Sequence, residues 1–344
     1  MGKSRIASLP ALLVACAISL PLLASCTSAA VTRSRTATRQ LAELKGSDTV
    51  ASDEFGVSVA ISGTSAVVGT SGAAYAGRAY VFAKSASGWT QVAELKGSDT
   101  VADDYFGWSV AVSGTTAVVG AVGHAKYMGR AYVFTKTPSG WDQTAELEGS
   151  DIVAQNGFGT SVAVLGTTAI VGAEGYAKGT GRAYVFTETA SGWKRVFVLK
   201  GSDTVTGDNF GTSVAISPTT AIVGAYGRAD NAGRAYVFAK DAALWKQTAE
   251  LRGSDTTTGD YFGISTAISG TSVVVGAYDH AEDAGRAYVF AKTASGWKET
   301  AELKGSDTVA EDYFGSSVAV SGTTAVTGSY GQAKYAGRAY VFKS

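Results

Sequence analysis

Cysteine, histidine and proline are scarce in this 344-residue chain, which contains 2, 2 and 4 of them. Beyond Cys16 and Cys26 there is no thiol for a disulfide framework, a cysteine metal site or a cysteine nucleophile. The formal net charge of zero argues against a nucleic-acid-binding protein with a basic surface. His124 and His280 share no motif, and HExxH, GxSxG and phosphate-loop sequences are absent. We therefore expect neither enzymatic activity nor a cofactor.

Residues 1–25 have the three parts of a secretory signal peptide. Lys3 and Arg5 give a positive start, residues 6–23 are mostly apolar, and small residues precede Cys26. Serine and proline interrupt the apolar run, which argues against a permanent membrane span.

The sequence Leu-Ala-Ser-Cys at residues 23–26 resembles the bacterial lipobox, in which the cysteine becomes the first mature residue and carries lipid. We expect a lipoprotein signal peptide over residues 1–25, then lipidated Cys26 within a polar, flexible tether over residues 26–37. The protein would then be exported and lipid-anchored to the bacterial cell envelope, at the cell surface or outer membrane. Ordinary secretion with an incidental Cys26 is the alternative.

Residues 38–344 are organised by the hexapeptide GRAYVF, which occurs six times at intervals of 52 residues. Its copies begin at Gly77, Gly129, Gly181, Gly233, Gly285 and Gly337. An FG dipeptide and a GSD tripeptide recur with nearly the same period. Self-similarity at such a period indicates a repeat architecture.

Each repeat contains four short apolar or alternating segments separated by turn sequences, as between residues 97 and 147. The 43 glycines and the many valines, tyrosines and threonines favour strands and tight turns, and no window of the body has a helical apolar period. The pattern predicts an all-β, six-bladed β-propeller of four-stranded blades. An extra strand-like segment at residues 38–44 precedes the first FG, and the chain stops directly after the sixth GRAYVF. We expect this N-terminal strand to complete the last blade.

Three segments, FGxSVAxS, VVGA and GRAYVF, repeat in register over residues 41–344 and resemble the FG-GAP repeat family of integrin α-chains and many bacterial surface proteins. The resemblance implies that the FG strand is innermost and that the tryptophan-bearing strand is outermost. Integrin-type repeats carry a DxDxDG calcium loop between their first two strands. The equivalent turns here, such as residues 62–65 and 113–116, contain no carboxylate, so we expect no metal site.

The loop before GRAYVF differs most among the six copies, and loops on a rigid scaffold are where binding residues concentrate. The candidate ligand-binding residues are His124, Lys126, Tyr127, Tyr176, Lys178, Arg228, Asp230, His280, Glu282, Lys334 and Tyr335. Neutral variation at exposed positions is the alternative. The family resemblance favours an adhesion or interaction module for a surface protein, with membrane contact only through the lipid and no nucleic acid.

Two other functions stay open. A propeller lectin that binds a glycan would use the repeated tryptophans Trp89, Trp141, Trp193, Trp245 and Trp297, although such residues more often pack between blades. A hydrolase would use carboxylates of the GSD-to-FG loops, which should make this face acidic. We interpret the GSD aspartates as structural turn residues. Asp103, Asp104 and their equivalents stay open, for a weak cation site or a basic partner. We also expect structural ion pairs between GRAYVF arginines and GSD aspartates, Arg78 with Asp99 and Arg130 with Asp151.

Overall fold

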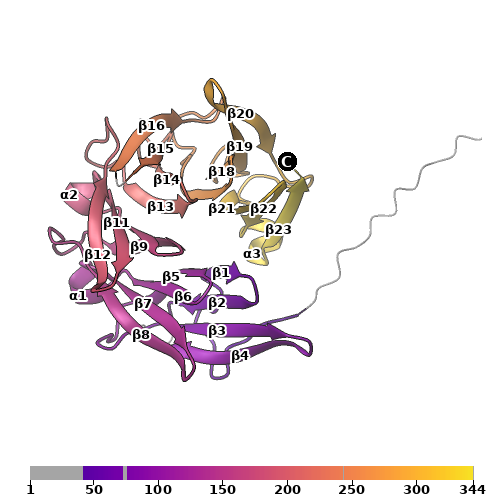
Figure 1. The fold of residues 1–344 in the computed structure, drawn as a ribbon. Helices are drawn as coiled ribbons and strands as arrows, with labels where there is room; N and C mark the ends of the chain where they lie inside the picture. Colours follow the sequence, from indigo (N-terminus) through magenta and orange to yellow (C-terminus); the bar gives the residue numbers. More distant parts are fainter. Residues whose placement is uncertain (1–41, 73–75, 243, 344) are drawn as a thin grey trace, which may run out of the picture. The chain divides into compact units, whose positions relative to one another are not determined.

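The computed structural model describes residues 42–72, 76–242 and 244–343, and the unit from Ala42 to Ser344 contains six antiparallel sheets. Cys26 and the predicted leader and tether lie outside the described residues. Five sheets have four strands and the last has three. This confirms the predicted all-β, six-bladed propeller (Figure 1).

The first three blades follow one another in the sequence. Blade 1 contains β1 (Ser58–Ser62), β2 (Ser65–Thr70), β3 (Arg78–Ser85) and β4 (Gly88–Leu95). Blade 2 contains β5 (Phe106–Ser113), β6 (Thr116–Ala121), β7 (Arg130–Thr137) and β8 (Gly140–Leu147). Blade 3 contains β9 (Phe158–Leu165), β10 (Thr168–Ala173), β11 (Arg182–Thr189) and β12 (Gly192–Leu199).

The last three blades repeat this order. Blade 4 contains β13 (Phe210–Ile216), β14 (Thr220–Ala225), β15 (Arg234–Asp241) and β16 (Leu244–Leu251). Blade 5 contains β17 (Ser265–Ser269), β18 (Ser272–Ala277), β19 (Arg286–Thr293) and β20 (Gly296–Leu303). Blade 6 contains β21 (Phe314–Ser321), β22 (Thr324–Ser329) and β23 (Arg338–Lys343).

The burial of each strand follows from its place in the blade. The second strand of blade 2, β6, is buried at all six positions because both of its faces pack against other blades. The outer strand β8 instead alternates between half-buried and exposed residues, as expected for a strand with one solvated face. The phenylalanine of FG is fully buried in blades 2 to 6, whereas Phe55 of blade 1 is partly buried. Phe106 contacts the rings of Tyr132 and Phe134 at 5.4 and 6.0 Å.

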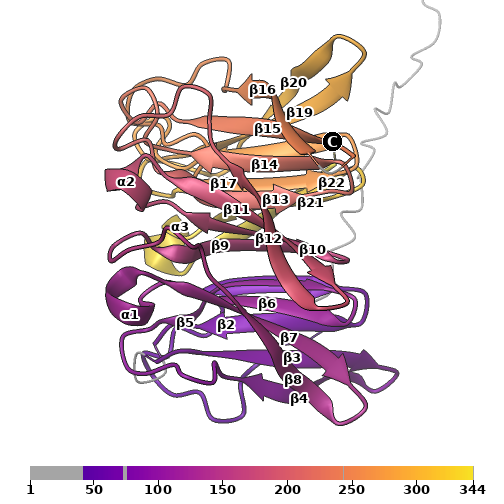
Figure 2. The same cartoon turned by 60° about the vertical axis from the view of Figure 1, so that its left-hand side comes forward.

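Consecutive blades are joined by backbone and side-chain contacts. Gly129 of blade 2 forms a parallel bridge with Phe158 of blade 3, and the same bridge recurs at the other blade junctions up to Gly285 and Phe314. Ser109 Oγ donates a hydrogen bond of 2.8 Å to the carbonyl of Gly159 in the next blade. Figure 2 shows the blades from the side, with α1, α2 and α3 at the same end of the propeller.

The facing edges of blades 1 and 6 are less buried than the other junctions. Val59 of β1 and Val341 of β23 are both 69% exposed, whereas Val110, the equivalent of Val59 in blade 2, is 8% exposed. Leu44 packs against the core of blade 1, as Leu95 does against that of blade 2, but residues 42–44 form no strand. Residues 38–41 lie outside the described part, so completion of blade 6 by an N-terminal strand stays a prediction.

In blades 2 to 6, the loops before GRAYVF are short turns with a left-handed backbone. They include α1 (His124–Tyr127), α2 (Tyr176–Gly179) and α3 (Gln332–Tyr335). Within α1, Ala125 and Lys126 have φ values of 50° and 62°, a conformation that non-glycine residues adopt at some cost in free energy. Among the described residues, no helix has the length and apolar character needed to cross a membrane.

Candidate functional site

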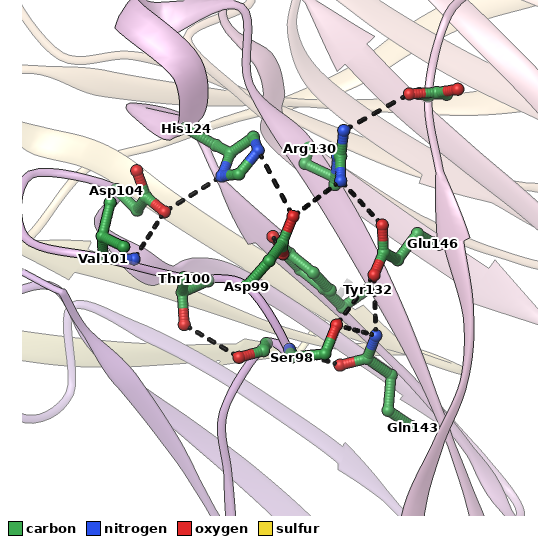
Figure 3. A network of polar contacts seen from close by, with 12 residues as sticks. Ser98, Asp99, Thr100, Val101, Asp104, His124, Arg130, Tyr132, Gln143 and Glu146 are labelled. Atoms are coloured by element: carbon green, nitrogen blue, oxygen red, sulfur yellow. Dashed lines mark hydrogen bonds and ion pairs between the residues drawn. The ribbon is translucent and has the colours of Figure 1, made fainter.

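The loop face is the end of the propeller formed by the GSD-to-FG loops and the turns before GRAYVF. In blade 2 these are residues 97–105 and 122–129, which precede β5 and β7. Most of the polar side chains on this face hold the loops to their own blade (Figure 3). The contacts of these side chains separate structural residues from those available to a ligand.

The aspartate of each GSD accepts a hydrogen bond from the tyrosine of GRAYVF in the same repeat. In blade 2, Tyr132 Oη donates to Asp99 Oδ1 at 2.6 Å, and the equivalent bond recurs in all six blades. The Tyr132 ring is fully buried, and burial together with this hydrogen bond raises the pKa of its hydroxyl. The GSD aspartate thus has a structural role, because it holds the hydroxyl of a buried tyrosine. Its place in a turn sequence did not predict this hydrogen bond.

A second acidic or amide residue, two positions before each FG, closes its own loop. Asp104 is 3% exposed, and its Oδ2 accepts a hydrogen bond from the backbone N–H of Val101 at 2.8 Å. Asn156 makes the equivalent bond in blade 3. These buried carboxylates are therefore not part of an open acidic surface.

The predicted partners of the GRAYVF arginines were wrong by one blade. Arg78 pairs with Asp48 rather than Asp99, and Arg130 pairs with Asp99 at 2.9 Å rather than with Asp151. The chain crosses to the next blade after each outer strand, so a GSD aspartate joins the blade that follows it. In blades 4 and 5, Arg234 and Arg286 instead pair with Glu250 and Glu302 of their own outer strands.

The first residue of three turns before GRAYVF bridges both aspartates of its blade. His124 Nδ1 lies 3.0 Å from Asp104 Oδ2, and its Nε2 lies 3.7 Å from Asp99 Oδ2. His280 and Arg228 occupy the same position in blades 5 and 4 and contact the equivalent carboxylates. The histidines thus share a structural position, although no common motif was assigned to them from the sequence. Their spacing of 156 residues, three periods of 52, was the available signal.

The other candidate residues separate into packed and exposed groups. Tyr176 is half-buried, and the guanidinium of Arg182 lies 3.8 Å from its ring centre. The exposed candidates are Lys126, Tyr127, Lys178, Asp230, Glu282, Lys334 and Tyr335. The backbone of these turns also contacts the next blade, because the carbonyls of Lys126 and Tyr127 accept hydrogen bonds from Gln155 and Gly157.

A recess opens on the loop face at the propeller axis. It consists of two hollows of about 580 and 620 Å³ that share Trp108, Thr160 and Glu174. The residue after FG in every blade lines the second hollow, which places this hollow on the axis. These residues are Val57, Trp108, Thr160, Thr212, Ile264 and Ser316.

Three positions around this recess vary among otherwise similar blades. They are the residue before FG, the residue after FG and the residue after the GA of the second strand. The last position is Ser71, Val122, Glu174, Tyr226, Tyr278 and Tyr330 in blades 1 to 6. The comparison of the six repeats with one another did not identify this site, because each variable position is a single residue between repeated segments. Their shared place in the repeat was the signal that could have revealed them.

Aromatic rings form an arc on the side of blades 4 to 6. Tyr261 contacts Tyr226 and Tyr278 at centroid distances of 5.5 Å each. The arc continues through Tyr313, which stacks on Tyr330 at 4.7 Å. Burial and the charge of Glu174 raise the pKa of the Tyr226 hydroxyl. On the opposite side, Tyr105 contacts Trp108 and Tyr127 at 6.5 and 6.1 Å.

The five repeated tryptophans lie at the starts of the outer strands, away from the recess. Trp245 is 4% exposed, and Trp141 and Trp193 are half-buried against the cores of adjoining blades. Within residues 42–72, 76–242 and 244–343, no group of three or more His, Cys, Asp or Glu is placed to hold a metal ion.

The model of the FG-GAP repeat family matches six segments of the chain. They are residues 38–82, 89–134, 141–186, 193–238, 245–290 and 297–342. Each segment runs from an outer strand, or its sequence equivalent, to the end of the next GRAYVF. No curated protein matches the chain in sequence.

Solved structures with a similar fold include Sqt1 from two fungi. Two crystal structures of Chaetomium thermophilum Sqt1 are 18% and 17% identical, each with a TM-score of 0.50. Both alignments cover 85% of this chain and 72% or 73% of the other. Saccharomyces cerevisiae Sqt1 is 9% identical over 85% of this chain and 83% of its own, with a TM-score of 0.49. At these identities the two Chaetomium structures support the fold alone.

Proposed function

The chain belongs to the FG-GAP repeat family, and we propose that it is a binding module whose loop face contacts a protein partner at the cell surface. The observation that carries this proposal is the asymmetry of the recess. Six blades share their core and loop frame, yet the residues around the axis differ from blade to blade. A rigid scaffold with one varied surface is suited to a single partner site.

The exposed turns extend this surface outward from the recess. Tyr127 and Tyr335 are 47% and 68% exposed, although both belong to turns that the backbone holds in place. Exposed tyrosine supplies large contact area with little loss of side-chain freedom, which favours protein recognition. We propose that export through residues 1–25 and a lipid on Cys26 present this face at the cell envelope.

Site-specific photo-cross-linking tests the proposal in the cells that produce the chain. Benzoylphenylalanine replaces Tyr127 on the loop face or Ser139 in the exposed hairpin between β7 and β8, at the opposite end of the blade. We expect one protein adduct of defined mass from position 127 and none from position 139. Equal adducts from both positions, or none from either, would contradict the proposal.

A loop exchange provides the matched variant. Residues 125–128 are replaced by AKGT, the sequence of residues 177–180, which belongs to the same left-handed turn in blade 3. His124 and its contacts with Asp99 and Asp104 are kept. The blade should keep its fold, while the contact surface of blade 2 changes. With the cross-linker moved to Tyr335, the adduct should weaken if blade 2 contributes to the partner site.

A further inference from the structure

The side chains that line the recess carry negative charge and no positive charge. Glu54 and Glu174 line the first hollow, and Glu174 also lines the second. No lysine, arginine or histidine lines either hollow within the described residues. An anionic ligand would therefore meet two like charges here without compensation, whereas a cation would be attracted.

Glu174 is positioned to act as a counter-charge. It is half-buried between the two hollows, and Thr160 Oγ1 donates a hydrogen bond of 3.2 Å to its Oε1. This bond limits the rotation of the carboxylate, and among the described residues Oε2 accepts no hydrogen bond, so it could face a ligand. Partial burial strengthens its attraction for a cation relative to that of a fully solvated carboxylate.

The aromatic side chains next to Glu174 add a second attraction for a cation. Trp108 is 43% exposed at the point where both hollows meet, and Tyr105 contacts it at an angle of 71°. An indole ring attracts a cation placed over its face more strongly than other aromatic rings do. Tyr261 and Tyr278 are stacked nearly parallel, at 12° with ring centres 5.5 Å apart, so each ring covers part of one face of the other.

We propose that this recess receives a lysine or arginine side chain of the partner protein, with Glu174 as counter-charge and Trp108 as the cation–π surface. This inference rests on the proposed protein-binding function. The aliphatic stem of either basic residue would pack against Val122 and Trp108 while its charged group lies near Glu174. The recess is thereby a specificity pocket within a larger contact surface.

The test uses ¹⁹F NMR of the full chain labelled with 5-fluorotryptophan. Replacement of Trp108 by threonine, the residue at the equivalent position of blades 3 and 4, assigns the Trp108 resonance. The probes are the blocked tripeptides Gly-Lys-Gly and Gly-Arg-Gly, with Gly-Gln-Gly and Gly-Glu-Gly as controls. We expect the basic peptides at millimolar concentration to shift the Trp108 resonance and to leave the other five tryptophans unchanged.

Removal of the counter-charge tests the role of Glu174. Glu174→Gln should weaken the binding of the basic peptides about fivefold or more, which is the scale expected for the loss of one partly desolvated ion pair. Glu188→Gln removes the same charge from an exposed site on β11 outside the recess and should leave binding unchanged. Equal shifts from Gly-Gln-Gly, or an unchanged affinity in Glu174→Gln, would overturn the proposal.

Two further probes separate the sources of the ligand. Butylammonium and methylguanidinium should bind more weakly than the tripeptides, because they lack the flanking peptide groups. If they bind as tightly, the recess is a site for free amines rather than for a protein side chain. A Trp108 shift with methyl glucoside alone would indicate a sugar site and overturn the proposal.

Failure of the recess assignment can be distinguished from failure of the proposed protein-binding function. A partner adduct at position 127 that is unaffected by Glu174→Gln would refute only the assignment of the recess. Absence of any adduct would refute protein binding on this face, while the tripeptide titration would still report whether the recess accepts a cation.

Discussion

The hydroxyl of Tyr132 donates a hydrogen bond of 2.6 Å to Asp99, which lies 33 residues earlier in the chain. This bond joins a fully buried ring of β7 to the GSD loop that enters the same blade. The same hydrogen bond occurs in all six blades, so in each blade it holds the GSD loop to the core.

Tyr132→Phe should remove this hydrogen bond without changing the shape of the core. We expect a loss of about 1.5 kcal/mol in the free energy of unfolding, since the acceptor is charged but 44% exposed. Urea denaturation measures the loss. Tyr340→Phe in blade 6, where the tyrosine is only partly buried, is the control and should lose less. Equal losses would show that burial does not strengthen the bond.

Gly181 is required by the approach of the next blade. Its φ is +77°, and a Cβ at this position would lie 1.9 Å from the carbonyl oxygen of Phe210. Gly337 has the same place in the repeat and a φ of +72°, but its nearest neighbours are 3.7 Å away. Both alanine variants would lose stability because a residue with a Cβ must adopt a left-handed backbone conformation. Only in Gly181→Ala would the Cβ also force blades 3 and 4 apart.

Gly181→Ala should therefore destabilise the protein by at least about 2 kcal/mol more than Gly337→Ala, the scale of overpacking in a closely packed site. Thermal unfolding followed by circular dichroism compares the two variants. If both variants lower the melting temperature equally, the left-handed backbone conformation alone explains why glycine is required at these positions. That result would argue against a tight junction between blades 3 and 4.

The repeated segments made the fold predictable from the sequence. Four strands per repeat follow from alternation and from turn residues at a constant period, and the structure has these strands. The inner position of FG was implied by the family resemblance, and the core around Phe106 agrees with it. Contacts between repeats were less predictable. Arg130 was assigned to Asp151, which is near it in strand order, but the chain carries Asp151 across to Arg182 in the next blade.

The recess was not predictable for a similar reason. Trp108 and Glu174 belong to different repeats and meet only because the blades are arranged around an axis. Periodicity shows which positions are equivalent, but not that six equivalent positions face one another. The turns before GRAYVF were correctly located in the loops, yet their first residues, such as His124, are bound to buried aspartates of their own blade.

Lipid attachment at Cys26 is tested independently of the fold. In a bacterial host, the full chain should incorporate radiolabelled palmitate and sediment with membranes. Cys26→Ser should lose the label and appear in the soluble fraction, because no acceptor thiol would remain at the lipobox. Cys16→Ser, within the apolar leader, is the matched control and should retain both properties. Label retained in Cys26→Ser would refute the lipobox interpretation.

Asp279 introduces a carboxylate where the other five blades have glycine. Its Oδ1 is buried without a hydrogen-bond partner among the described residues. Burial, followed by the charges of Asp283 and Asp260, raises the pKa of Asp279 from its ordinary value of 3.8 to about 6. Between these pH values the folded protein holds a proton that the unfolded chain releases, so stability should fall as pH rises from about 4 to about 6.

Asp279→Asn should remove this fall, because an amide does not ionise. At pH 4 the variant and the natural protein should be similarly stable, and at pH 7 the variant should be more stable by about 1 kcal/mol, less than the full shift implies because solvent screens a partly exposed group. Urea unfolding at several pH values measures the difference. Asp230→Asn, which removes a carboxylate from the exposed turn of blade 4, is the control variant. A gain in Asp279→Asn that is equal at pH 4 and pH 7 would mean that the carboxylate destabilises the loop by its shape rather than by its charge.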